Sequence, residues 1–488
     1  MADFYRNPLV ARYASAGMSE LFGAQRRVRT WRRVWLALAE SQAELGLPIS
    51  AKQIGQLRKS LNDIDLAKAA EYEKKLRHDV MAHLHAWGDA APAARGILHL
   101  GATSMDIVDN ADLIIQREAM TMVRDWLVNV ILGLSRFACT YRDVPCLGYT
   151  HFQPAQLTTV GRRACLWAYD FVRDLEEIDH RLTGLRFRGI RGATGTQASF
   201  LTLFGGDARK VARLEKKVAA RLGFKEVESI TGQTYARKID AEIVAGLGHI
   251  ATSAHKFAND IRLLAGLKEI EEPFEEDQVG SSAMAYKRNP MRCERITGLS
   301  RYVLSLVSSA MQTAAEQWLE RTLDDSSNKR IVMAEGFLAT DGILRIATDV
   351  ARGLVVYPKV IESRVMAELP FMATEEILMA AATSGKGKRK GSKSKAEQMG
   401  DRQALHERLR QHSQAAAREV KMQGQPNDLL RRLAADPAFA AVDLDRALAP
   451  QQFVGLAPRQ VDDFLSEVIQ PILHRYRSVR RLDAALDV

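Results

Sequence analysis

Residues 157–185, LTTVGRRACLWAYDFVRDLEEIDHRLTGL, carry the clearest structural signal in the chain. Apolar residues recur there in steps of three and four, at positions 157, 160, 164, 167, 171, 175, 178, 182 and 185. This spacing places them on one face of an α-helix. The stretch therefore predicts a long amphipathic helix, and we expect Pro154 to open it, since proline is favoured in a first helical turn.

A second stripe of this kind occupies positions 239, 243, 247, 250, 254, 257, 261 and 264. Both stripes repeat about every 3.5 residues, the spacing with which long helices pack side by side in a bundle. Proline, which breaks helix interiors, is absent between Pro154 and Pro273 and between Pro290 and Pro358. Because strand-like alternation is hard to find, the sequence predicts an all-α fold.

The composition is that of an ordinary globular protein, with 47% of the 488 residues hydrophobic and 26% charged. No run reaches the roughly 18 apolar residues that predict a membrane span, and the first residues, MADFYRNPLVARYAS, do not resemble a targeting signal. The four cysteines form no C-x-x-C pair, so reduced structural thiols are expected. We therefore expect a cytoplasmic protein.

The net charge of +10 is concentrated in one segment. Residues 385–395, GKGKRKGSKSK, hold six of the positive charges and no acid, and the rest of the chain carries only +4. This composition predicts a basic flexible loop over 385–398. Nucleic-acid binding through this tract is the alternative to an exposed solvated loop, and the solvated loop is the favoured interpretation.

The segment GSSAMAYKRNP at 280–290 is the first candidate for chemistry. It joins flexible serines to Lys287 and Asn289, and Pro290 is suited to begin the next helix. A positive, donor-rich segment at a helix start favours anion binding. A plain solvated loop is the alternative.

A histidine in the stretch YTHFQPAQ at 149–156 is the second candidate. His151 lies among hydrogen-bonding side chains, including Thr150, at an expected helix entry, where it could transfer a proton near neutral pH. A structural histidine is the alternative.

Three histidines in RHDVMAHLH at 77–85 invite a metal interpretation, which their spacing opposes. A helical zinc pair needs positions i and i+4, whereas these lie at i, i+5 and i+7. The sequence also lacks the G-x-x-x-x-G-K-[ST], G-x-G-x-x-G and G-x-S-x-G motifs. ATP-driven, hydride-transfer and serine-hydrolase chemistry are therefore disfavoured.

Several motifs together resemble the adenylosuccinate lyase family of the fumarase/aspartase superfamily. GSSAMAYKRNP is similar to the superfamily's signature loop, and further motifs narrow the match: RHDVMAH at 77–83, HLGATS at 99–104, THFQPAQLTTVG at 150–161, RGATGTQASF at 191–200, ITGQTYARK at 230–238 and WLERTLDDSSNKR at 318–330. The resemblance covers nearly the whole chain.

This resemblance implies a homotetramer whose active sites are shared between subunits. It implies three helical domains, an N-terminal one at 1–110, a central long-helix bundle at 111–356 and a C-terminal one at 357–488. The implied reaction is β-elimination of fumarate from adenylosuccinate, giving AMP, and from SAICAR, giving AICAR. The resemblance implies no metal and no cofactor.

The resemblance also assigns site residues. It implies that Ser281 is the general base and His151 the general acid, with Lys287 and Glu294 in supporting catalytic roles. It places substrate binding on Arg12, Tyr13, Arg77, His78, Asp79, Thr103, Ser104, Thr150, Gln233, Asn289, Arg295, Arg321, Ser326 and Arg330. Ala285 departs from the family, which usually has proline there, and the basic tract resembles an insertion.

Two other functions are weighed against this one. Another superfamily lyase, such as argininosuccinate lyase or a carboxymuconate cycloisomerase, gives no reason for nucleotide-binding arginines such as Arg321 and Arg330. A non-catalytic structural protein on the same scaffold gives no reason to retain both Ser281 and His151.

Overall fold

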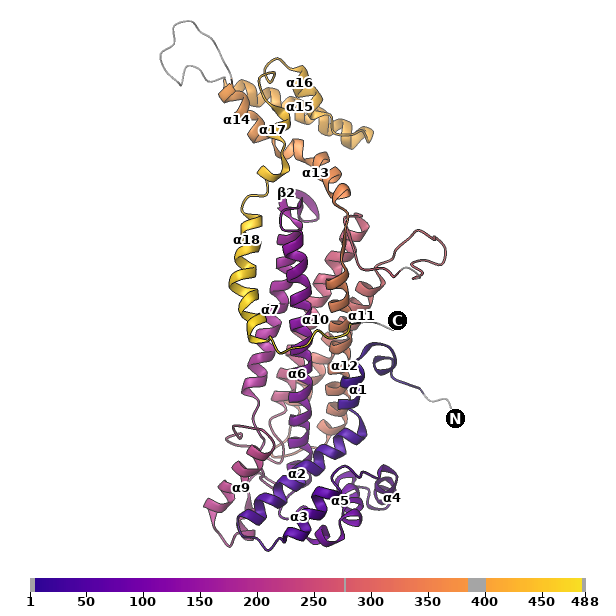
Figure 1. Cartoon of the computed structure of the whole chain (residues 1–488), viewed down its shortest axis with the longest axis vertical. Coiled ribbons are helices and arrows are strands. Elements are labelled where there is room, and N and C mark those ends of the chain that lie inside the picture. The colour runs from indigo at the N-terminus through magenta and orange to yellow at the C-terminus, as the bar shows by residue number, and fades with distance from the viewer. Residues whose placement is uncertain (1–4, 276–277, 385–400, 485–488) are drawn as a thin grey trace.

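Five long helices pack side by side to form the centre of the computed structural model, which describes residues 5–275, 278–384 and 401–484 (Figure 1). They are α6 (Ser104–Thr140), α7 (Val160–Gly184), α10 (Lys238–Gly266), α11 (Met291–Ala315) and α12 (Asp324–Gly353). The predicted all-α bundle is confirmed. The predicted basic loop over 385–398 lies outside the described residues.

The two apolar stripes face the core of this bundle. In α7 the buried stripe positions are Val160, Ala164, Trp167, Phe171, Leu175 and Ile178. In α10 they are Ile243, Leu247, Ile250, Ala254, Phe257, Ile261 and Leu264. Burial of a large apolar side chain stabilises a fold by about 1.5–3 kcal/mol, so these stripes hold the helices together.

One expectation about α7 is wrong. The helix begins at Val160, and Pro154 lies in a strand. Residues 145–159 form an antiparallel hairpin of β1 (Pro145–Thr150) and β2 (Gln153–Thr159), in which Tyr149 pairs with Pro154. The helix start is set instead by Thr159, whose hydroxyl accepts a 3.1 Å hydrogen bond from the Arg162 N–H.

Shorter helices cover one end of the bundle, the lower end in Figure 1. They surround a second apolar cluster that includes Trp31, Trp35 and Trp87. These helices are α2 (Ala24–Glu44), α3 (Ala51–Lys59), α4 (Leu66–Leu76), α5 (Asp79–Ala90), α8 (Ala198–Leu203) and α9 (Ala208–Arg221). Helix α1 (Ala16–Leu21) packs instead against α6 and α12, and its Met18 and Leu21 belong to the bundle core.

The C-terminal helices lie at the opposite end, beside the β1–β2 hairpin (Figure 1). They are α13 (Pro358–Met372), α14 (Thr374–Ser384), α15 (Arg402–Gln423), α16 (Leu429–Ala435) and α17 (Leu444–Ala447). The chain then returns along α7 as α18 (Ala457–Phe464) and α19 (Gln470–Arg475). Two short strands, β3 (Ile270–Glu271) and β4 (Val355–Val356), pair where α10 and α12 end.

Helix α6 crosses residue 110, the predicted boundary between the first two domains. We keep the three-part division at 110 and 356 as a proposal. None of the helices in the described ranges combines the length and apolarity needed to cross a membrane.

Candidate active site

A cavity of about 1000 Å³ opens between the N-terminal helices and the adjacent ends of α6 and α12. Its size falls in the range of protein pockets that hold small molecules. Nine of the substrate-binding residues expected from the sequence line it: Arg77, His78, Asp79, Thr103, Ser104, Gln233, Arg321, Ser326 and Arg330. The fold therefore brings together four segments that are far apart in the sequence.

The turn between α4 and α5 presents the first two of these residues. Arg77 ends α4 with φ of 53°, a left-handed conformation that turns the chain. His78 then caps α5, and its Nδ1 accepts a 3.4 Å hydrogen bond from the Met81 N–H. The other ring nitrogen lies 3.4 Å from the Ser104 hydroxyl, so α5 and α6 meet at the cavity wall.

The three histidines of this segment do not converge. His78 faces the cavity, whereas His83 packs against Trp31 and His85 stacks on Tyr72. Among the residues that the structure describes, no group of three or more His, Cys, Asp or Glu side chains could hold a metal ion.

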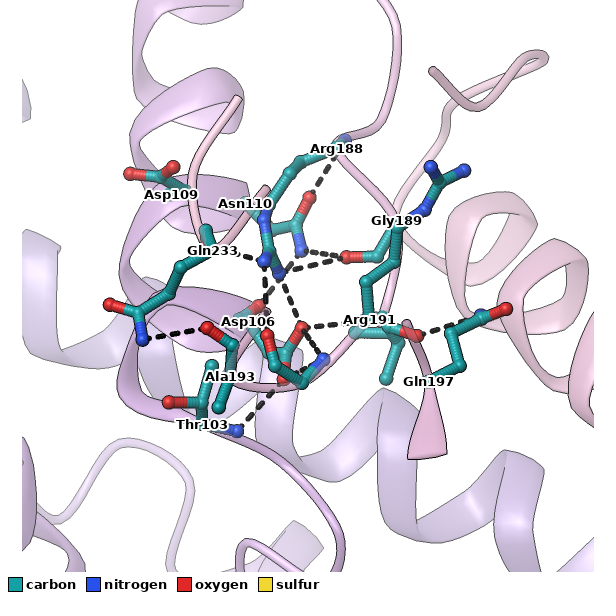
Figure 2. A network of polar contacts seen from close by, with 12 residues as sticks. Thr103, Asp106, Asp109, Asn110, Arg188, Gly189, Arg191, Ala193, Gln197 and Gln233 are labelled. Atoms are coloured by element: carbon teal, nitrogen blue, oxygen red, sulfur yellow. Dashed lines mark hydrogen bonds and ion pairs between the residues drawn. The ribbon is translucent and has the colours of Figure 1, made fainter. Parts of the chain in front are cut away.

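A buried carboxylate positions Thr103 and Ser104 at the start of α6 (Figure 2). Asp106 accepts hydrogen bonds from the N–H groups of Thr103 at 2.8 Å, Arg191 at 2.7 Å and Gly192 at 3.1 Å. It also forms an ion pair with Arg188, and both side chains are fully buried. The segment that contains Arg191 and Gly192 is thereby attached to the start of α6, next to Thr103 and Ser104.

The same arginine also fixes the segment that carries Gln233 (Figure 2). Arg188 donates to the Gly232 carbonyl at 3.1 Å and to the Gln233 carbonyl. The Gln233 side chain in turn donates to the Ala193 carbonyl at 3.0 Å. Removing one partner of a buried ion pair costs about 3–5 kcal/mol, so loss of Arg188 or Asp106 would strongly destabilise this wall of the cavity.

Alternating charges surround the start of α12. Arg321 Nη1 lies 2.7 Å from both carboxylate oxygens of Asp325, which also pairs with Arg237 at 2.5 Å. Arg237 extends the array to Asp109, 3.0 Å away. Burial raises the pKa of Asp109, but Arg237 and Lys329 outweigh it and hold that pKa below its usual value.

Three cations that line the cavity were not expected from the sequence: Arg237, described above, Lys329 and Arg27. Lys329 lies 2.7 Å from Asp112 and 4.7 Å from the centre of the Tyr235 ring. Its position beside Arg330 in a charged run was a usable signal. Arg27, from α2, lines the cavity with its guanidinium 5.6 Å from the Trp31 ring centre. No motif around Arg27 indicated it.

His151 lies outside this cavity, at the other end of the bundle. It forms, with Phe152, the two-residue turn of the β1–β2 hairpin, and both residues have φ of 55°. Two residues with positive φ define a type I′ turn, which normally uses asparagine and glycine. His151 and Thr150 are exposed at this tip.

The signature loop is also outside the cavity and folds on itself. The Ser281 hydroxyl accepts a 3.1 Å hydrogen bond from the Met284 N–H, and the Asn289 side chain donates to the Gly280 carbonyl at 2.8 Å. Lys287 is exposed on the loop. Pro290 precedes α11 as expected, Glu294 lies in the first turn of α11, and Arg295 follows it.

Arg12 and Tyr13 form a third group away from the cavity. They lie on a short π-helical segment, Leu9–Tyr13, that packs along α12. Arg12 is exposed, and the Tyr13 carbonyl accepts a 2.9 Å hydrogen bond from Arg345. One chain therefore presents the expected site residues at four separate places.

Comparison with known proteins identifies the family. The family model described as "Lyase" matches residues 19–305, and that described as "Adenylosuccinate lyase C-terminus" matches residues 396–464. The chain is 49% identical to the adenylosuccinate lyase of Schizosaccharomyces pombe, over 98% of each chain. It is 49% identical to that of Saccharomyces cerevisiae, over 97% of each, and 43% identical to that of Schistosoma mansoni, over 99% of each.

The chain belongs to the adenylosuccinate lyase family.

Solved structures agree with this fold. The 3-carboxy-cis,cis-muconate lactonizing enzyme of Pseudomonas putida has a TM-score of 0.78 at 22% identity, covering 95% of this chain and 99% of its own. A fumarate lyase of Mesorhizobium has a TM-score of 0.75 at 24% identity, covering 95% and 100%. At these identities the likeness concerns the fold alone.

The comparisons confirm three predictions made from the sequence of this adenylosuccinate lyase family member: the family, the lyase class and the helical fold. The alternative superfamily lyases are disfavoured by the C-terminal family match and the full-length relatives. The roles of individual residues stay predictions.

Proposed function

We propose that this lyase eliminates fumarate from adenylosuccinate, giving AMP, and from SAICAR, giving AICAR. The observation that carries the proposal is the cavity, which collects nine of the expected substrate-binding residues. Relatives that share about half of their residues with this chain over nearly their whole length bear the same enzyme name. The substrates are anions with two carboxylates and a phosphate, and cations and hydroxyls dominate the expected set.

In this proposal the cavity binds the nucleotide. Arg77, Arg321 and Arg330 supply guanidinium groups, which match the geometry of phosphate and carboxylate oxygens. Hydroxyls of Thr103, Ser104 and Ser326 and the amide of Gln233 add neutral hydrogen bonds. His78 and Asp79 complete the set at the start of α5, where Arg330 pairs with Asp79 at 2.8 Å.

The chemistry is a proton removal followed by cleavage of a C–N bond. Ser281 takes the carbon proton next to a carboxylate, and Lys287 and Asn289 stabilise the negative charge that collects on that carboxylate. His151 gives a proton to the departing nitrogen, which is the exocyclic purine nitrogen in adenylosuccinate and the carboxamide nitrogen in SAICAR, and Glu294 supports this histidine. The elimination breaks one C–H and one C–N bond and forms the C=C bond of fumarate and an N–H bond. It has no net oxidation or reduction, so it needs no redox cofactor, and the proposal assigns no step to a metal.

Assembly completes the site in this proposal. In one chain the hairpin with His151 and the cavity lie at opposite ends of the bundle (Figure 1). We propose a homotetramer in which other subunits bring His151, Ser281, Arg12, Tyr13 and Arg295 to each cavity. The bundle helices expose large apolar side chains that a second subunit could cover: Leu166, Tyr169, Leu263, Leu304, Met311 and Ile331.

The proposal places the enzyme in the cytosol, acting on small nucleotides with no nucleic-acid partner. The nucleotide substrates and the four free cysteines fit a reducing compartment.

The direct test is to follow fumarate release from each purified nucleotide. Ser281→Ala is expected to lower kcat by at least about a thousandfold, because it removes the group that is proposed to take the carbon proton, while adenylosuccinate still binds. Binding is measured by calorimetry on the variant. Substantial fumarate release by Ser281→Ala would contradict the assigned base, and absence of fumarate release by the unaltered enzyme would contradict the function.

A further inference from the structure

The turn that carries His151 is held in an unfavourable backbone conformation. His151 and Phe152 both have φ of 55°, although neither is glycine, asparagine or aspartate. Such a residue costs about 1–3 kcal/mol and persists only where neighbouring contacts enforce it. The contacts that enforce this turn should therefore be visible beside it.

Those contacts start at Tyr149, three residues before Phe152. The two rings lie 5.7 Å apart between centroids, with 30° between their planes, so the turn rests on the tyrosine. The Tyr149 hydroxyl donates a 3.2 Å hydrogen bond to Oε1 of Glu269, which lies between α10 and β3. Tyr149 is half-buried, which limits its alternative positions.

Glu269 is the anchor of this arrangement. Its side chain is only 1% exposed, and Arg364 from α13 donates to the same Oε1 at 2.8 Å. Arg364 also reaches the Tyr149 hydroxyl at 3.4 Å. Within the described ranges the buried Oε2 of Glu269 makes no hydrogen bond, so the carboxylate depends on these two partners.

We infer that Tyr149, Glu269 and Arg364 are positioning residues for His151. They join α13, the end of α10 and strand β1 into one rigid support, on which Phe152 and the turn rest. This inference depends on the proposed role of His151 as general acid. Misplacement of a reacting group by about 1 Å can cost up to about a hundredfold in rate. The support therefore matters to kcat and not to substrate affinity.

Tyr149→Phe tests the inference with little risk to folding, since the ring and its packing stay. We expect kcat to fall about tenfold, with KM changed less than about twofold, because a general acid contributes about 10²–10⁴ in rate and loses part of that when displaced. Glu269→Gln, which weakens both hydrogen bonds to Oε1, should give a loss of similar size.

The matched control is Tyr476→Phe. Tyr476 is also half-buried, and its hydroxyl also contacts a carboxylate, that of Asp179 near the end of α7 furthest from the hairpin. Its kcat should stay within about twofold of the unaltered enzyme. A tenfold loss in this control would overturn the inference, since any tyrosine–carboxylate contact would then affect the rate equally.

A double-mutant cycle separates positioning from general stability. In a His151→Gln background, Tyr149→Phe should lower kcat by less than about twofold, since the group that it positions is gone. An equal fold-loss in both backgrounds, or no loss from Tyr149→Phe alone, would overturn the inference. If His151→Gln alone kept the full kcat, the proposed acid role would be wrong. The single variant shows this without the double mutant, so failure of the acid role is distinguished from failure of the positioning inference.

Discussion

At the scale of single residues, Arg321 offers the clearest test of the cavity. Within the part of the chain that the structure describes, the side-chain hydrogen bonds of Arg321 both use Nη1, so the rest of the guanidinium can face an anion in the cavity. We expect Arg321→Gln to raise KM for adenylosuccinate about ten- to a hundredfold, since a hydrogen bond to a charged group contributes about 1.5–3 kcal/mol. Steady-state kinetics of fumarate release measure this.

The control for this change is Arg301→Gln, an exposed arginine on α11 that does not line the cavity. Its KM should be unchanged. Equal KM values for Arg321→Gln and the unaltered enzyme would remove Arg321 from the binding site.

The sequence predicted which residues line the cavity where those residues stand in a recognisable motif. Arg77, His78, Thr103 and Ser104 stand in such motifs, and the structure places all four at one cavity. Arg27 was not predictable, because it is one of several arginines on α2 and only the packing of that helix turns it toward the cavity.

At the scale of elements, the pairing of α7 with α10 contains a titrating group. Burial, with a smaller contribution from Asp170 and against a hydrogen bond from Ser253, raises the pKa of Asp174 on α7 to about 7. The folded state thus binds a proton that the unfolded state releases near pH 4. This contribution to stability is present at low pH and is lost as pH rises through about 7.

We therefore expect Asp174→Asn to stabilise the enzyme relative to the unaltered chain at pH 8 more than at pH 5. The amide keeps the shape of the side chain and cannot ionise. Thermal unfolding of both proteins at the two pH values measures the difference. An identical shift in Tm at pH 5 and pH 8 would show that Asp174 does not titrate in this range.

Elements were predictable from the sequence where apolar periodicity was long. The apolar stripes of α7 and α10 extend over about seven turns each. A few polar residues that fall on a stripe by chance do not obscure a period of that length. The β1–β2 hairpin was missed because its strands are short and its turn contains His151 and Phe152 in place of asparagine and glycine. Pro154, which fits a helix start as well as a strand, then favoured the wrong element.

At the scale of the whole molecule, the rod-like bundle separates the groups that the chemistry needs. The cavity lies at one end, the His151 hairpin at the other, and the loop with Ser281 between them at the side (Figure 1). The sequence patterns predicted these residues as site residues. They do not predict how subunits pack, so the place where these residues meet could not be predicted. The shared site that we propose would give all three a common function.

Complementation between two inactive variants tests this central claim most directly. Ser281→Ala and His151→Ala chains, carrying different affinity tags, are produced together, and hybrid assemblies are isolated through both tags and verified by native mass spectrometry. If sites are shared, some sites in each hybrid combine an intact Ser281 with an intact His151 from different subunits. We expect these hybrids to release fumarate at a substantial fraction of the unaltered rate, while each variant alone stays inactive. Verified hybrids that are as inactive as either parent would contradict the account.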